Sequence, residues 1–290
     1  MPGRVRPRPR VSYALGMARS PSRRKSPLVA LAALGAALVG TLGVVVAAVA
    51  GGALTGAELL PDLRQEPPSQ VAVKRDAGRP VLVFRSAAAN VGQGPLVLNG
   101  RRERGQRTMD VTQELRRADG SVVQVPIRAR LKYQPGWHRH WHVLGFNRFD
   151  LRDPATGARV AVSRKVGFCL GSRYQVVPEV PGTPASPAIN HNCGRSLPGL
   201  MRMRMGIDVG YADDYAAFVE FQYIDLSGVR PGRYLLAHQG DPDGHLVVGD
   251  RSDDTAYALI DLTPPRRAGG LPGVSVVATS VGTPPVAPPS

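Results

Sequence analysis

The chain of 290 residues is 43% hydrophobic and 20% charged, which supplies enough apolar material for one large or two modest folded domains. Its formal net charge is +15, but eight of the 37 basic residues precede Glu58, the first acidic residue. The rest of the chain therefore carries 29 basic residues against 22 acidic ones. This concentration of positive charge is typical of a targeting segment and does not indicate nucleic-acid binding.

The N-terminal region has the pattern of a membrane anchor. Residues 1–25 predict a basic cytoplasmic arm, and no charged residue occurs in residues 26–57. Residues 28–50 are Leu, Val, Ala and Gly with one Thr, which suffices for a helix that spans a bilayer with its arginine-rich flank in the cytoplasm. A signal peptide cleaved after Ala50 is the alternative, and the protein would then be secreted. Both interpretations place the chain from residue 58 onward outside the cytoplasm.

Two cysteines, Cys169 and Cys193, lie in this exported part. An even number of cysteines in an oxidising compartment favours one disulfide. Free buried thiols are the alternative.

Residues 58–262 contain short apolar runs separated by glycine and proline turn signals. They lack sustained helical periodicity, which favours one all-β, sandwich-like domain with long loops. The N-terminal hydrophobic segment is the one helix that we expect. Residues 263–290 are rich in Pro, Gly, Val and Ser and predict a disordered tail. The expected strands are 81–84, 87–91, 96–98, 111–115, 121–125, 141–151, 218–226, 234–237, 245–248 and 256–262, with turns at 92–95, 99–100, 118–120 and 240–244.

Three of the six histidines alternate in the stretch Trp137-His138-Arg139-His140-Trp141-His142. In a β-strand this spacing places His138, His140 and His142 on one face, with roughly 6.6–7 Å between successive Cα atoms of the set. Three imidazoles on one face can hold a transition metal and leave a coordination position open. The two tryptophans would give the strand an apolar opposite face. A solvated polar strand face is the alternative.

Several separated blocks resemble the lysyl oxidase family, in a form like that of actinobacterial members, over about residues 58–262. The histidine stretch resembles the copper-binding His-x-His-x-His motif of that family. The other matching blocks follow in the same order: Ser163–Leu170, ending in Phe-Cys-Leu; Gly206–Tyr215, continued by Gln222–Leu226; Pro231–Tyr234; and Gly249–Asp254.

The resemblance implies a copper-dependent amine oxidase with a self-derived lysine tyrosylquinone cofactor. Lys165 and Tyr215 stand at the positions of the lysine and tyrosine that form the quinone. Asp213 matches an acid beside the tyrosine and is the candidate base that removes the substrate α-proton, with Asp214 as a substitute. Such an enzyme converts a primary amine, either peptidyl lysine or a small amine, to an aldehyde and releases peroxide and ammonia.

The resemblance also implies a calcium site that joins the two ends of the domain. Its ligands would be Asp62 and Leu63 from the N-terminal side, and Asp250, Asp253 and Asp254 from the C-terminal side. Carboxylate and carbonyl oxygens are the ligands that calcium prefers. An exposed acidic turn is the alternative.

This chain departs from the animal members of the family at three positions. Tyr211 and Phe221 occupy positions where those members have a cysteine pair, whereas Cys169 and Cys193 match a retained pair. Ala212 replaces a bulky aromatic residue beside the cofactor tyrosine.

Two other functions fit the histidine stretch. A copper-binding surface protein with the same fold but no catalysis would not need both Lys165 and Tyr215. A zinc hydrolase with three histidine ligands would need a general base nearby and would keep its activity without Tyr215. The amine oxidase is the function that we expect.

Overall fold

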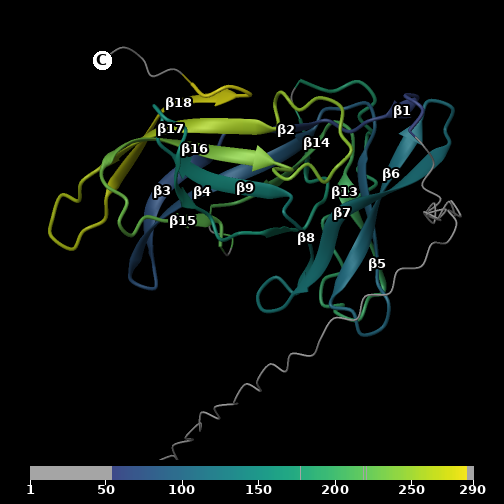
Figure 1. Cartoon of the computed structure of the whole chain (residues 1–290), viewed down its shortest axis with the longest axis horizontal. Coiled ribbons are helices and arrows are strands. Elements are labelled where there is room, and N and C mark those ends of the chain that lie inside the picture. Colours follow the sequence, from purple (N-terminus) through teal and green to yellow (C-terminus); the bar gives the residue numbers. More distant parts are fainter. Residues whose placement is uncertain (1–53, 177, 218, 220, 286–290) are drawn as a thin grey trace, which may run out of the picture. The chain divides into compact units, whose positions relative to one another are not determined.

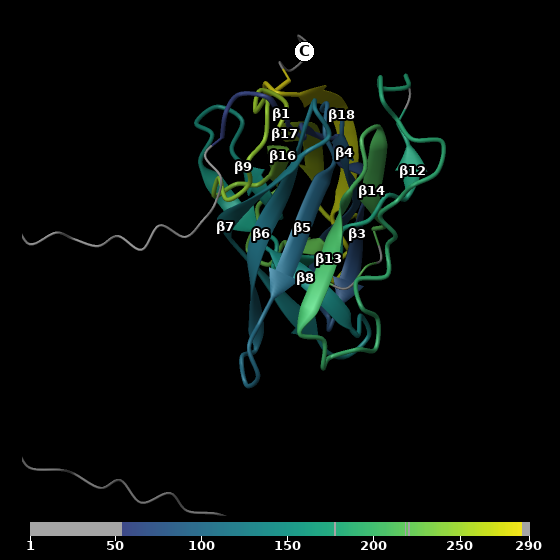
Figure 2. The same cartoon turned by 90° about the vertical axis from the view of Figure 1, so that its right-hand side faces the viewer.

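The computed structural model describes residues 54–176, 178–217, 219 and 221–285, and every regular element in them is a β-strand (Figures 1 and 2). The all-β prediction is therefore confirmed for this part of the chain. The predicted basic arm and residues 28–50 lie outside the described residues. Within the described part, no helix has the length and hydrophobicity needed to cross a membrane.

The first sheet has seven strands and lies on the right of Figure 1, where β5, β6 and β7 run side by side. Its order is β11-β8-β7-β6-β5-β13, and β1 pairs with β6. Every pair is antiparallel, so alternate side chains point to the core and to solvent. The strands are β1 (Glu58–Leu59), β5 (Leu96–Arg101), β6 (Thr108–Arg117), β7 (Val122–Gln134), β8 (His140–Leu144), β11 (Gly167–Phe168) and β13 (Arg202–Ile207).

A second sheet of five strands lies on the left of Figure 1, in the order β10-β9-β16-β17-β18. Its strands are β9 (Asn147–Arg152), β10 (Arg159–Val162), β16 (Gly232–Gly240), β17 (Thr255–Thr263) and β18 (Gly273–Val281). β18 pairs with β17 along its whole length, so the predicted disordered tail is wrong for residues 273–281. Val274 packs against the main hydrophobic core, and Val277 and Ala278 pack against a second cluster formed by β16 and β17. These contacts supply the apolar burial that the tail's proline and glycine content concealed.

The third sheet is built around β4, a strand of 12 residues that joins two segments predicted as separate strands. Its order is β12-β14-β4-β15, and both β2 and β3 also pair with β4. β4 is buried on both faces for most of its length, as expected for a central strand. The strands are β2 (Leu63–Gln65), β3 (Ser69–Asp76), β4 (Arg79–Asn90), β12 (Tyr174–Gln175), β14 (Tyr211–Tyr215) and β15 (Tyr223–Asp225).

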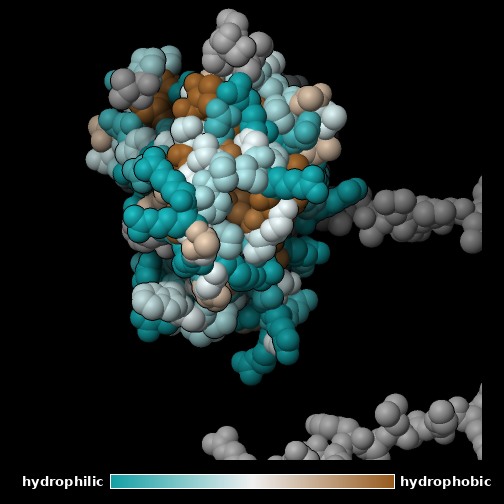
Figure 3. Space-filling view, turned by 90° about the vertical axis from the view of Figure 1, so that its left-hand side faces the viewer, coloured by the Kyte–Doolittle hydropathy of each residue, from teal (hydrophilic) through white to brown (hydrophobic). Residues whose placement is uncertain are grey.

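One hydrophobic core unites the three sheets. It includes Leu98 and Leu131 from the first sheet, Leu236 and Ile260 from the second, and Phe84 from β4. Viewed from the left of Figure 1, hydrophobic surface forms separate areas among hydrophilic residues (Figure 3). Because the core residues come from all three sheets, the sheets are parts of one folded unit.

One predicted turn and two predicted strands differ from the structure. Asn99 and Gly100 do not form a turn, because they lie inside β5 opposite Thr112 and Val111. A Cβ atom on Gly100 would lie 2.5 Å from Leu131 Cδ1, so this glycine serves close packing. The predicted strand 245–248 is irregular, and the predicted strand 218–226 is reduced to Tyr223–Asp225, with residues 218 and 220 outside the described part.

Candidate active site

The histidine stretch is not the continuous strand that its alternation predicts. β8 begins at His140 and ends at Leu144, and a turn at Gly145 separates it from β9. Arg139 has a left-handed backbone with φ of 44°, so His138 lies in the preceding turn. Trp137 is 89% exposed and does not form an apolar face, whereas Trp141 is fully buried.

The three imidazole rings nevertheless converge. Ring centroids of His138 lie 5.2 Å from His140 and 5.1 Å from His142, and the last two lie 4.7 Å apart. One ligand nitrogen from each ring falls within 4.8 Å of the others, and no other group of three or more His, Cys, Asp or Glu side chains in the described residues meets this spacing. Because Arg139 has a left-handed backbone, the three imidazole rings converge although the stretch is not a regular strand.

Burial keeps two of these rings neutral. Desolvation, followed by the charge of His138, lowers the pKa of His140 to about 4. Desolvation, followed by the charge of His140, lowers the pKa of His142 to about 2. Neutral imidazole is the form that binds metal. The Nε2 atoms of His140 and His142 lie 2.8 Å apart, and Nδ1 of His140 is buried without a hydrogen-bond partner. This donor set fits a transition metal with nitrogen ligands.

The disulfide holds a segment against the start of β8. Cys169 and Cys193 are bonded, as predicted, with Cα atoms 5.8 Å apart. The carbonyl oxygen of Cys193 accepts a hydrogen bond from the Trp141 N–H at 2.8 Å, and the Arg139 carbonyl accepts one from the Ser196 N–H. The Trp141 indole N–H also donates to the Leu197 carbonyl at 3.1 Å. The disulfide and the residues that directly follow Cys193 therefore fix the backbone that carries the histidines.

Lys165 and Tyr215, which are 50 residues apart in the sequence, meet beside this cluster. Lys165 precedes β11, and Phe168 of β11 pairs with Val143 of β8. The Nζ atom of Lys165 lies 5.0 Å from the ring centroid of Phe168 and 5.2 Å from that of Tyr215. Both Lys165 and Tyr215 are 6% exposed. Gly167 permits this arrangement, because a Cβ atom there would lie 2.6 Å from Nδ1 of His142.

Tyr215 and Asp213 are buried on β14, which pairs with β4. The Tyr215 hydroxyl group lies 2.8 Å from Asp213 Oδ2 and also contacts the Cys169 carbonyl oxygen. Burial is the main cause that raises the pKa of Asp213, and burial followed by the Asp213 charge raises the pKa of Tyr215. Two contacting, buried groups with raised pKa values are typical of acid–base chemistry.

Sequence reasoning missed His191, Arg173 and Arg195, which line the same cavity. This cavity has a volume of about 270 Å³ and is also lined by the three histidines, Lys165 and Tyr215. A second cavity of about 170 Å³ reaches His138, His142 and Lys165 from the side of Phe221. His191 carries only a weak sequence signal, its position two residues before Cys193.

Asp214 points into the cavity and is held by two arginines. Arg85 Nε donates to Asp214 Oδ2 at 3.1 Å, and Arg173 Nε lies 2.8 Å from Oδ1. Arg85 also contacts Glu66 and Tyr174. Asp214 is therefore a paired anion at the cavity wall, whereas Asp213 beneath it has no solvent exposure.

The residues expected to bind calcium are only partly assembled. Desolvation, followed by the charges of Asp253 and Asp250, raises the pKa of Asp62 to about 6. Asp254 instead pairs with Arg251 at 3.0 Å, and the Leu63 carbonyl accepts a hydrogen bond from Gln65. One carboxylate oxygen of each of Asp62, Asp253 and Asp254 is buried without a partner, which fits a cation nearby.

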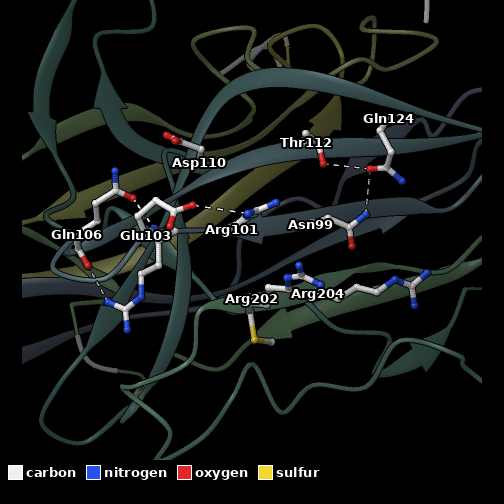
Figure 4. A pocket seen from close by; sticks show the side chains of 12 residues that line it. Asn99, Arg101, Glu103, Gln106, Asp110, Thr112, Gln124, Arg202 and Arg204 are labelled. Atoms are coloured by element: carbon white, nitrogen blue, oxygen red, sulfur yellow. Dashed lines mark hydrogen bonds and ion pairs between the residues drawn. The ribbon is translucent and has the colours of Figure 1, made fainter. Parts of the chain in front are cut away.

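A larger polar groove of about 910 Å³ lies elsewhere, over β5, β6 and β13 (Figure 4). Its arginines face acids, as in the contact of 3.6 Å between Arg101 and Glu103. None of the predicted site residues lines it. Size alone therefore does not mark the site, and the smaller cavity at the histidines is the candidate.

Tyr211 and Phe221 stand at the positions where, by the resemblance, animal members have a cysteine pair, so no disulfide can form there. Tyr211 is buried, and its hydroxyl group donates to the Pro184 carbonyl at 3.0 Å. Phe221 is 40% exposed and has a φ of 61°. Ala212 packs with Ala89 and Val176, so the space of a bulky aromatic residue is filled by the strand packing.

An all-β fold with three converging histidines, two of them buried, and a lysine beside a tyrosine defines a candidate metal-dependent enzyme. A model of the lysyl oxidase family matches residues 113–257, half of the chain. Protein-lysine 6-oxidase of Rattus norvegicus is 27% identical over 139 residues, which is 47% of this chain and 30% of that protein. Lysyl oxidase homolog 1 of Homo sapiens is 28% identical over 148 residues, which is 50% of this chain and 23% of that protein.

This chain therefore belongs to the lysyl oxidase family. The match spans about a third or less of the length of these two relatives.

Proposed function

We propose that this protein is a copper-dependent amine oxidase that converts primary amines to aldehydes outside the cytoplasm. The observation that carries the proposal is the placement of Lys165 Nζ at 5.2 Å from the Tyr215 ring, in the cavity that the three histidines line. A protein that only binds copper has no need for this pair. Relatives named protein-lysine 6-oxidase favour peptidyl lysine as the substrate class, and small amines are the other choice.

His138, His140 and His142 are the proposed copper ligands. Their converging nitrogens and the unpartnered Nδ1 of His140 fit an ion with nitrogen preference. Copper held there would supply the redox chemistry with O2 that self-processing of a tyrosine requires.

Lys165 and Tyr215 are the proposed precursors of the lysine tyrosylquinone. Burial of Lys165 against two aromatic rings restricts its amine to the neighbourhood of the Tyr215 ring, which favours one crosslink over attack by other amines. The Cys169 carbonyl and Asp213 orient the phenol. Asp213 is the proposed base for the substrate α-proton, because burial raises the pKa of this carboxyl group and makes it a stronger proton acceptor than an exposed one.

The disulfide supports the proposed location. Cys169 and Cys193 are oxidised in the structure, and such bonds persist outside the reducing cytoplasm. We propose that residues 28–50 act as the anchor or leader that exports residues 58–281. If residues 28–50 are deleted, the protein should remain in the cytoplasm, which fractionation would measure.

The substitution Tyr215→Phe tests the oxidase directly. The variant should bind copper as the unmodified protein does, yet peroxide release from an amine should be lost because the quinone needs the phenol oxygen. Tyr211→Phe is the matched control, since Tyr211 is on the same strand and equally buried but its hydroxyl group bonds to Pro184. Peroxide release that persists in Tyr215→Phe would contradict a quinone cofactor formed from Tyr215. Copper binding without amine oxidation in the unmodified protein would point to the non-catalytic alternative.

A further inference from the structure

One side of the Asp213 carboxyl group is not explained by the proposed chemistry. Oδ2 contacts the Tyr215 hydroxyl and accepts from the Gly171 N–H at 3.3 Å. Oδ1 lies 3.3 Å from Nε2 of His191. Within the described residues, neither of these last two atoms has a hydrogen-bond partner, although both are buried. Two unpaired polar atoms of complementary chemistry therefore face each other.

His191 is held at this position by contacts outside the cavity. The Ser172 N–H donates to the Ile189 carbonyl at 3.0 Å, and the Ile189 N–H donates to buried Asp208 at 2.9 Å. A Cβ atom on Gly171 would lie 2.5 Å from His191 Cα, so only glycine allows this approach. The disulfide at Cys193 fixes the other end of the segment.

Arg173 determines which ring nitrogen of His191 carries the proton. Its NH1 group lies 3.4 Å from Nδ1 of His191, and a guanidinium group only donates. Nδ1 is therefore the acceptor, and the neutral ring carries its proton on Nε2, toward Asp213. Desolvation, followed by the charges of Arg173 and Arg195, lowers the pKa of His191 to about 4, so the ring is neutral at pH 7. A backbone hydrogen bond and the charge of Asp214 act on this pKa in the opposite direction.

We propose that His191 is a positioning residue that directs its Nε2 proton at Asp213 and favours the ionised form of this carboxyl group. Arg173, His191 and Asp213 then form a chain that links the cavity wall to the acid beneath Tyr215. The catalytic consequence rests on the proposed function, because Asp213 is the base there. The approach of His191 Nε2 to Asp213 Oδ1 at 3.3 Å does not depend on that function.

Two substitutions separate the Nε2 donor from mere packing. In His191→Gln, the amide N–H group can occupy about the same position as the Nε2–H group of histidine. In His191→Asn, the side chain is one bond shorter and its amide cannot reach that position. Both variants are polar and of similar size. His245→Gln is the matched control, because His245 lies on the loop after β16 and bonds to Asp241 through its backbone N–H.

The first readout is the infrared titration of protonated Asp213 in the full, metal-free chain, with its band assigned by Asp213→Asn. A hydrogen bond to a charged group moves a carboxyl titration by about one to two pH units. His191→Asn should raise the Asp213 midpoint by this amount, while His191→Gln and His245→Gln should remain within a few tenths of a unit of the unmodified protein. An unchanged midpoint in His191→Asn, or an equal rise in both His191 variants, would overturn the proposal.

The second readout uses the copper-loaded protein. The rising limb of the kcat–pH profile should move upward in His191→Asn by the same amount, with KM and copper content unchanged. If the unmodified protein oxidises no amine, the proposed function fails while the infrared titration still decides the role of His191. An infrared shift in an active enzyme whose kcat profile stays fixed would show that Asp213 is not the base and would remove the catalytic role of His191.

Discussion

Arg139 shows how one residue's backbone builds the site. A non-glycine residue in the left-handed region costs roughly 1–2 kcal/mol, and a well-packed surrounding must impose it. In the part of the chain that the structure describes, four of the seven non-glycine residues with positive φ are Arg139, Cys193, Ser196 and Phe221, all at or beside the candidate site. The His-x-His-x-His spacing correctly predicted the cluster. It could not predict the turn at Arg139, because alternation assumes extended backbone throughout.

Replacement of Gly167 should weaken copper binding. The Cβ atom of Gly167→Ala would press on Nδ1 and Cβ of His142, so the ring must move out of the cluster. Displacing a ligand or its support typically costs 10–100-fold in metal affinity, and we expect a loss of about this size by copper titration. Gly199→Ala is the control, because nothing lies within 4 Å of a Cβ atom there. Equal copper affinity in the two variants would contradict the placement of His142.

At the scale of elements, the sequence predicts strands that have a clear local pattern. It does not predict strands whose extent is set by pairing with other strands. The turn at 118–120 and the strands beside it follow the chain's own signals, and β6 and β7 form there. The merged β4 pairs with β14 and β15, which lie far along the chain, and no local pattern reveals those partners. β18 pairs with the preceding strand β17, but the proline and glycine residues around it concealed its strand signal. The pairing of Lys165 with Tyr215 was available only through the family resemblance, since β11 and β14 belong to different sheets.

The proposed calcium site belongs to this scale, because it joins the start of β2 to the segment before β17. The folded-state pKa of Asp62 is raised to about 6, so ionisation of Asp62 reduces stability as the pH rises from 3.8 through 6. Bound calcium would reverse this loss. We expect calcium at 100 times its Kd to stabilise the protein by about 2.7 kcal/mol at pH 7.5, with a much smaller effect at pH 5.

Thermal unfolding with and without calcium would measure this difference. Asp62→Asn should reduce the calcium response and also raise the stability of the calcium-free protein at pH 7.5. A melting temperature that calcium leaves unchanged at pH 7.5 would contradict the proposed calcium site. Magnesium at the same concentration is the control for ionic strength.

At the scale of the whole molecule, stability should fall in mild acid. His238 on β16 lies in the core with no exposure, where it stacks on Phe149 at 4.7 Å and contacts the Glu66 carbonyl at 3.1 Å. Burial lowers its folded-state pKa from 6.5 to about 4. The unfolded chain therefore binds more protons between these values, and stability declines as the pH falls from 6.5 to 4, by at most ~3 kcal/mol from this residue.

Denaturant unfolding across this pH range would test the prediction. His238→Asn keeps a donor toward Glu66 but does not titrate, so its stability should vary less with pH than that of the unmodified protein. The buried histidines of the candidate site contribute to both proteins in the metal-free state. Identical pH slopes in the two proteins would show that His238 is not the source.

In the proposed enzyme, Lys165 and Tyr215 form a cofactor beside the three histidines. Peptide-mapping mass spectrometry of the full chain, produced with copper and air, tests it most directly, with copper-free protein as the control. We predict a crosslinked peptide pair that contains Lys165 and Tyr215 at the mass of the quinone, found only in the copper-treated sample. Fully copper-loaded protein in which both residues remain unmodified would contradict the claim.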